Sequence, residues 1–150
     1  MKKNELYFDV CTLLTYDEPF NIVIGGRGTG KTYSSLSYAI KHFKETGRRF
    51  IFMRRTQTEI DFMARTESAN PMKSVNPDVA LKNIESRFFA FILDGEIIGY
   101  AFALSTVSSI RGIDMSDVDV WIFDEFIPEF HVHKIAHEGL AFLTASETFN

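Results

Sequence analysis

The chain has 150 residues, of which 45% are hydrophobic and 14% aromatic, enough apolar material for one folded domain. Its formal net charge of −4 has the wrong sign for a domain that coats nucleic acid, so any such contact is expected to be local. The single cysteine, Cys11, excludes an internal disulfide and is expected to be a small buried residue. No run approaches the ~20 apolar residues that span a bilayer, so we expect a cytosolic protein without a membrane partner.

Two clusters of basic residues are candidates for a local contact with nucleic acid. They are Lys41 to Lys44 with Arg48 and Arg49, and the pair Arg54 and Arg55. The alternatives are a solvated helix end for the first cluster, and capping or phosphate chemistry for the second.

The first expected elements alternate between strand and helix. Residues 20–24 form an apolar, β-branched run before glycines, which is typical of a buried parallel strand. Residues 31–44 carry apolar side chains at helical spacing, and Gly47 stands where a helix would end. Residues 49–54 are again strand-like. This order predicts a right-handed crossover and a parallel sheet.

Further elements follow in the second half of the chain. A short helix is expected over 56–66, and the two Asn-Pro pairs within 67–80 indicate a loop. The runs 87–93 and 96–104 flank Asp94-Gly95, which favours a β-hairpin with a two-residue turn. Residues 118–123 form another apolar strand. A helix is expected somewhere after Lys134.

The glycine-rich segment after the first expected strand carries the most specific motif. It reads Gly25-Gly26-Arg27-Gly28-Thr29-Gly30-Lys31-Thr32 and fits G-x-x-x-x-G-K-[ST], the Walker A pattern. Glycines let successive backbone N–H groups face one phosphate, and the following helix N-terminus adds partial positive charge. Lys31 is expected to reach the β- and γ-phosphates, and the Thr32 hydroxyl to ligate Mg²⁺.

A second acidic motif, of the Walker B type, decides the chemistry. Asp124 and Glu125 follow the strand at 118–123, at the sheet edge where α/β folds bind ligands. Asp124 is expected to hold Mg²⁺, and Glu125, pointing the other way, to act as base for a water. The alternative is a pair of solvated acids closing a strand. An Asn-Lys-x-Asp guanine-binding motif is absent from the sequence, so we expect ATP as the nucleotide.

Together the motifs predict a P-loop NTPase core of the RecA/ASCE type over residues 1–150. Its fold class is α/β, with a mostly parallel sheet flanked by helices and an inserted β-hairpin.

Three residues have weaker assignments. Arg27 is a candidate cis arginine finger, with an exposed loop arginine as the alternative. Arg111, after Ser108-Ser109-Ile110, is a candidate coupling residue or part of an ordinary loop. Tyr16 could stack on adenine or be a core aromatic. The pattern of His131, His133 and His137 matches no common zinc site, so surface or capping histidines are expected.

The combined motifs resemble the DNA-packaging (encapsidation) ATPases of small short-tailed phages, relatives of the large terminase ATPases. The resemblance rests on residues 20–32, on the Arg54-Arg55 end of the second strand, on 88–104 with its turn, and on 122–127. It implies that Lys31 and Thr32 bind phosphate and magnesium, that Asp124 holds the metal, and that Glu125 is the catalytic base. In this resemblance Arg27 corresponds to the arginine found in terminase phosphate loops. Arg111-Gly112 corresponds to their Arg-Gly step before the acidic strand.

The resemblance also implies partners. Members form homomeric rings on the capsid portal, where RNA is a further possible partner, and drive double-stranded DNA inward. The expected location is thus the host cytoplasm and, transiently, the procapsid portal. Members also continue beyond the acidic strand, so the chain is expected to be the N-terminal part of a longer packaging protein, with weak activity in isolation and with DNA contacts mainly in other parts.

Two alternatives to a packaging ATPase stay open at this point. One is another DNA-translocating or helicase-like ATPase, which shares both motifs. The other is a non-hydrolysing module that binds nucleotide to control assembly, and the orientation of Glu125 distinguishes it from an enzyme.

Overall fold

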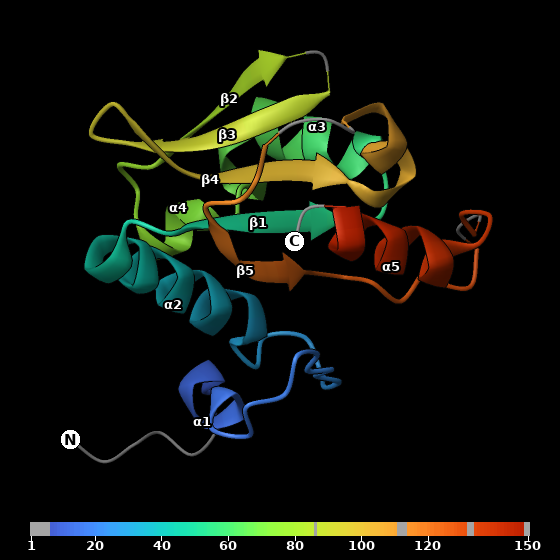
Figure 1. Cartoon of the computed structure of the whole chain (residues 1–150), viewed down its shortest axis with the longest axis horizontal. Helices are drawn as coiled ribbons and strands as arrows, with labels where there is room; N and C mark the ends of the chain where they lie inside the picture. The colour runs from blue at the N-terminus through green and yellow to red at the C-terminus, as the bar shows by residue number, and fades with distance from the viewer. Residues whose placement is uncertain (1–6, 86, 111–113, 132–133, 149–150) are drawn as a thin grey trace.

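A computed structural model describes residues 7–85, 87–110, 114–131 and 134–148 (Figure 1). Its centre is a mixed sheet of five strands in the order β2-β3-β4-β1-β5. Their bounds are β1 Arg49–Arg54, β2 Ala80–Glu85, β3 Phe88–Leu93, β4 Glu96–Ala103 and β5 Val118–Phe123. Strand β1 pairs in parallel with both β4 and β5, whereas β2–β3 and β3–β4 are antiparallel. The α/β class is confirmed, but the sheet is mixed and not mostly parallel.

Helices flank this sheet on both faces. They are α1 Val10–Leu14, α2 Lys31–Thr46, α3 Gln57–Arg65, α4 Met72–Val75 and α5 Glu138–Thr148, with 3₁₀ helices η1 Glu67–Ala69 and η2 Leu104–Ile110. Figure 1 shows α3 behind the sheet and α5 in front of it, near the ends of the parallel strands. Within the described residues, no helix has the length and apolar character needed to cross a bilayer.

The alternation of side chains along β1 builds two hydrophobic cores. Phe50 and Phe52 point to one face and pack in a cluster with residues of α2, α3 and α4. Ile51 and Met53 point to the other face, which α5 and η2 cover. All four side chains are 0–1% exposed, so β1 is buried on both faces, as expected for the central strand of a parallel unit.

Glycine conformations define the ends of α2. Gly30 precedes the helix at φ 80° and Gly47 ends it at φ 72°, both in the left-handed region that favours glycine. The side chains of Leu36, Ala39, Ile40 and Phe43 are buried on one stripe, which confirms the helix predicted over 31–44.

The predicted hairpin is confirmed and belongs to the main sheet. Asp94 and Gly95 have φ values of 52° and 82°, as a type I′ turn requires, and Leu93 pairs with Glu96. The second hairpin strand, β4, also pairs with β1, so the hairpin is not a peripheral insertion. Strand β2 was not predicted, because its mostly exposed residues lack an apolar alternation.

The strand expected over residues 20–24 is wrong, and with it the crossover that would start there. This segment has no strand assignment, and Ile22 and Ile24 are 72% and 77% exposed. Apolar β-branched composition indicates that a segment can fit a sheet, but a strand also needs a partner for its ladder hydrogen bonds. Cys11 is also exposed, contrary to expectation, because α1 buries only Val10.

Candidate functional site

The glycine-rich loop lies directly before α2 and is largely exposed. Gly28 and Gly30 adopt φ values of 75° and 80°, which bend the backbone tightly before the helix begins. The Thr29 hydroxyl donates to the Gly26 carbonyl at 3.0 Å and braces the turn. The Phe8 N–H donates to the Thr29 carbonyl at 2.9 Å, so the N-terminal segment is tied to the loop.

Lys31 is folded back onto its own loop. Its ammonium donates to the carbonyls of Gly25 and Gly26 at 2.8 and 2.6 Å, and to the Thr29 hydroxyl at 3.0 Å. These acceptors are neutral carbonyl and hydroxyl oxygens of the loop itself.

Thr32 and Asp124 meet although they lie far apart in the sequence. The Thr32 hydroxyl is 3.1 Å from each Asp124 carboxylate oxygen. Thr32 is in the first turn of α2, and Asp124 directly follows β5, where its N–H donates to the Met53 carbonyl at 3.0 Å. The parallel pairing of β1 with β5 therefore places the acidic motif beside the loop.

Arg54, at the end of β1, joins the two acids. Its guanidinium donates to Asp124 Oδ2 at 2.9 Å and forms a second ion pair with Glu125. The side chains of Arg54 and Asp124 are only 13% and 15% exposed, whereas that of Glu125 is 60% exposed. The guanidinium also lies over the Phe52 ring, 5.5 Å from its centroid, and Arg54 Nε is buried with no hydrogen-bond partner among the described residues. The Arg54 guanidinium thus binds both carboxylates and keeps Asp124 and Glu125 close together.

The expectation that Glu125 points away from Asp124 is wrong. Both carboxylates bind the same guanidinium. Strand alternation ends at Phe123, and Glu125 has a φ of 52°, a left-handed conformation that is uncommon for a residue with a side chain. Such strain is often found at functional sites.

Arg27 is an exposed loop arginine that already has a partner. Its guanidinium donates to Glu129 Oε1 at 2.7 Å, and the side chains are 90% and 56% exposed. Glu129 lies in the segment after the acidic motif, and its second oxygen is 3.4 Å from His131 Nε2.

The remaining predicted residues lie outside this cluster. Tyr16 is 69% exposed, so the core-aromatic alternative is wrong. Arg111 and His133 fall outside the described residues. His137 lies at the turn before α5, and the described residues contain no group of three side chains suited to a metal ion.

The two arginines of the first basic cluster are paired with acids at or just before the start of β5. Arg48 donates to Asp119 at 2.8 Å, and Arg49 forms an ion pair with Asp117. The hydrogen bond from Arg48, with weaker contributions from His42, holds the pKa of Asp119 below its usual range. Arg48 and Arg49 lie at the amino end of β1, opposite the glycine-rich loop, whereas Lys41 and Lys44 of this cluster are exposed on α2.

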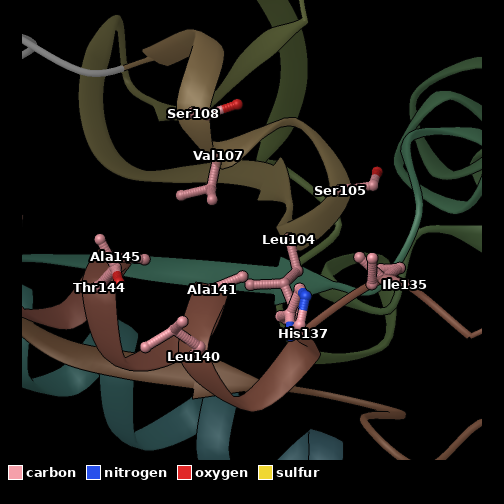
Figure 2. A pocket seen from close by; sticks show the side chains of 11 residues that line it. Leu104, Ser105, Val107, Ser108, Ile135, His137, Leu140, Ala141, Thr144 and Ala145 are labelled. Carbon is pink, nitrogen blue, oxygen red and sulfur yellow. The ribbon is translucent and has the colours of Figure 1, made fainter.

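A pocket of about 310 Å³ lies between η2 and α5, on the sheet face away from α2 (Figure 2). It is lined by Leu104, Val107, Ile135, Leu140 and Ala141, among others, and none of the loop residues line it. The start of α5 is fixed by an ion pair between Glu138 and the buried Arg55. The pocket is therefore separate from the candidate phosphate site.

Sequence reasoning missed Glu129 and the site role of Arg54. Arg54 was noted as a basic residue, but its contact with the acids follows from the β1–β5 register. Glu129 belongs to no recognisable sequence motif, and its partner Arg27 is separated from it by 102 positions. Tyr7, whose ring lies against Gly30 beside the loop, was also without a signal in the sequence.

Comparisons with known proteins agree on one family. The model of the Podovirus DNA encapsidation protein (Gp16) family matches residues 1–148. A DNA packaging protein of Bacillus phage PZA is 34% identical over 144 residues, which cover 95% of this chain and 42% of the relative. The chain thus spans less than half the length of that relative.

Solved structures point the same way. The N-terminal domain of the DNA packaging ATPase from bacteriophage phi29 superposes with a TM-score of 0.78 at 32% identity, covering 97% of this chain and 73% of that chain. A chain of the bacteriophage phi29 genome packaging motor assembly gives a TM-score of 0.73 at 32% identity, over 97% of this chain and 43% of the other. The chain therefore belongs to the Podovirus DNA encapsidation protein (Gp16) family, with the α/β fold of a packaging ATPase N-terminal domain.

Proposed function

We propose that this chain is the ATP-hydrolysing core of a phage DNA packaging motor, with a P-loop NTPase site between the glycine-rich loop and the acidic motif. The observation that supports this most is the meeting of Thr32 with Asp124 at 3.1 Å, with Arg54 bound to both Asp124 and Glu125. A hydroxyl, two carboxylates and a guanidinium beside a glycine-rich turn form a donor set suited to a magnesium nucleotide.

Binding of ATP would use the loop and the start of α2. Backbone N–H groups of the loop and the helix N-terminus favour a phosphate. Phosphate oxygens would replace the carbonyls that now hold the Lys31 ammonium, and Arg27 would reach the γ-phosphate. The exposed Tyr16 is available to stack on adenine.

The oxygen atoms of Thr32 and Asp124 fit Mg²⁺, which prefers few protein oxygens and retains several waters. Thr32 and Asp124 would hold this metal, which would supply positive charge to offset the negative charge that develops on the phosphate groups. Thr32 and Asp124 already contact each other, so little rearrangement of the backbone is needed to present both oxygens.

Hydrolysis would depend on Glu125. Its carboxylate, 60% exposed, can accept a proton from a water placed in line with the γ-phosphate. Arg54 holds this carboxylate beside Asp124, so we assign Arg54 the role of orienting the base. A nucleotide-binding module without turnover would have no need of an oriented carboxylate here.

The partners are proposed from the relatives. The bacteriophage phi29 neighbour is part of a genome packaging motor assembly. We propose that the full protein forms a ring at the capsid portal in the host cytoplasm, with RNA as a further partner, and moves double-stranded DNA, with Arg111 contributing to coupling. Other DNA translocases and helicase-like ATPases share the chemistry, and the family membership argues for packaging.

Steady-state Mg-ATP hydrolysis across a protein-concentration series, with and without duplex DNA, tests the proposal. Lys31→Ala should abolish nucleotide binding, because it removes the cation that faces the phosphates. Glu125→Gln should retain binding and lower turnover at least about 100-fold, the contribution typical of a general base.

Activity per subunit that rises with concentration and disappears in Glu125→Gln would support a motor subunit whose sites are completed between neighbours. Equal loss of nucleotide binding in both variants would contradict the roles assigned to Lys31 and Glu125. ATP binding without turnover in the unmodified chain would favour the nucleotide-controlled assembly module.

A further inference from the structure

Each cation of the candidate site is held by an acceptor of the protein itself. Lys31 is bound by loop carbonyls and Arg54 by the two acids. Arg27 differs, because its acceptor, Glu129 at 2.7 Å, belongs to neither the glycine-rich loop nor the acidic motif. The pair joins the loop before α2 to the segment after the acidic motif.

Glu129 itself has no part in the proposed chemistry. Its oxygens contact Arg27 and His131, whereas Asp124 and Glu125 bind Arg54. The Arg27 Nη2 group donates to Glu129 Oε1, and a phosphate group would compete for this donor of the guanidinium. The negative charge near Arg27 therefore opposes the movement of that arginine to a nucleotide.

From this geometry we propose that Glu129 is a positioning residue, which holds Arg27 away from the phosphates until a nucleotide displaces it. This inference rests on the proposed nucleotide site. The effect of the pair on nucleotide affinity is expected to be small, because side chains that are 90% and 56% exposed form an ion pair that solvent screens. Such a pair is expected to change nucleotide affinity by about twofold to fivefold.

The test is a double-mutant cycle read by equilibrium binding of a fluorescent ATP analogue, MANT-ATP with Mg²⁺. Glu129→Gln should tighten binding by about twofold to fivefold, because Arg27 is released. In the Arg27→Ala background the same change should have a clearly smaller effect. Glu147→Gln, at an exposed position on α5, is the control for removal of one negative charge.

The pair is also measured without nucleotide, from the Arg27 side-chain ¹⁵N resonance. This resonance should move in Glu129→Gln, return toward its original position in Glu129→Asp, and stay unchanged in Glu147→Gln. A resonance insensitive to Glu129 would overturn the proposal, because Arg27 would then not be held.

An effect of Glu129→Gln on MANT-ATP affinity that is equal with and without Arg27 would also overturn it, since a general repulsion of the nucleotide by Glu129 would explain that result. A third outcome is that no variant binds MANT-ATP while the Arg27 resonance is still sensitive to Glu129. This would overturn both the proposed function and the proposed competition between Glu129 and nucleotide for Arg27.

Discussion

Arg54 contacts both acids of the candidate site with a single side chain. It is nearly buried, carries a Phe52 ring beneath its guanidinium, and donates to both acids of the motif. Carboxylates this close repel each other when no cation lies between them. The arrangement of Asp124 and Glu125 therefore depends on a residue from a different strand.

We expect Arg54→Ala to lower the turnover of Mg-ATP at least about tenfold while MANT-ATP still binds, because Glu125 loses the group that orients it. Arg54→Lys should recover only part of the activity, since one ammonium cannot replace the planar fork. Comparing kcat with nucleotide affinity checks this, with Arg65→Ala on the exposed side of α3 as control. Full activity in Arg54→Lys would show that charge alone suffices.

The contacts of the site show what sequence can and cannot reveal at the residue scale. The loop and the pair Asp124-Glu125 were predictable, because each motif is contiguous and its chemistry follows from residue type. The side on which Glu125 lies was not, since it depends on a φ of 52° after the strand ends. Glu129 and Arg54 were not either, because their partners are brought together only by folding.

At the scale of elements, the pairing of β1 with β4 depends on one small residue. Gly99 lies opposite Phe50 in the parallel register. A Cβ at Gly99 would lie 2.6 to 2.7 Å from three atoms of the Phe50 ring, which is fully buried. The aromatic ring thus occupies the space that any other side chain at position 99 would need.

Gly99→Ala should lower the free energy of unfolding by about 1–3 kcal/mol, the usual cost of overpacking a well-packed core. Urea denaturation measures this change in the free energy of unfolding. The matched control is Gly139→Ala in α5, where a Cβ meets nothing within 4 Å and the alanine should leave stability unchanged or slightly higher. Similar losses in both variants would contradict the packing argument.

The elements divide into those with local and those with non-local determinants. Helix α2 and the hairpin turn could be predicted because their glycines and apolar spacing act within a few residues. The expected strand at 20–24 failed because composition does not specify a partner strand. Strand β2 was missed because it is an edge strand with mostly exposed residues, paired only with β3 among the described residues.

At the scale of the whole molecule, the two ends of β1 and β5 carry different groups of paired charges. The carboxyl ends of β1 and β5 carry the candidate site, whereas their amino ends carry the ion pairs Arg48–Asp119 and Arg49–Asp117. Asp119 accepts from Arg48 and from His42, which lies on α2, so it joins the helix to β5.

These amino-end contacts make global stability depend on pH. The pKa of Asp119 is lowered, first by its hydrogen bond to Arg48, so its stabilising effect is present above the usual value near 3.8 and is lost as pH falls through the lower folded value. Asp119→Asn should therefore reduce stability at pH 7, by less than about 1 kcal/mol because the pair is partly exposed, and its effect should shrink as the pH falls below about 3.8.

Thermal melts at pH 7, 5 and 3 check this prediction. Asp78→Asn, at an exposed turn before β2, is the control for the loss of one carboxylate. A difference between Asp119→Asn and the unmodified chain that grows as pH falls would have the wrong sign for the proposed contact.

The neighbouring arginines at the end of β1 have a mechanical consequence. Arg54 points to the acids and Arg55 to Glu138 at the start of α5, on the opposite face of the sheet. Arg54 ends β1 and Arg55 is the next residue, so a sliding of β1 along its axis would shift both ion pairs in the same direction. A displacement of α5 that pulled on Arg55 would therefore be expected to disturb the acidic motif through the adjacent Arg54.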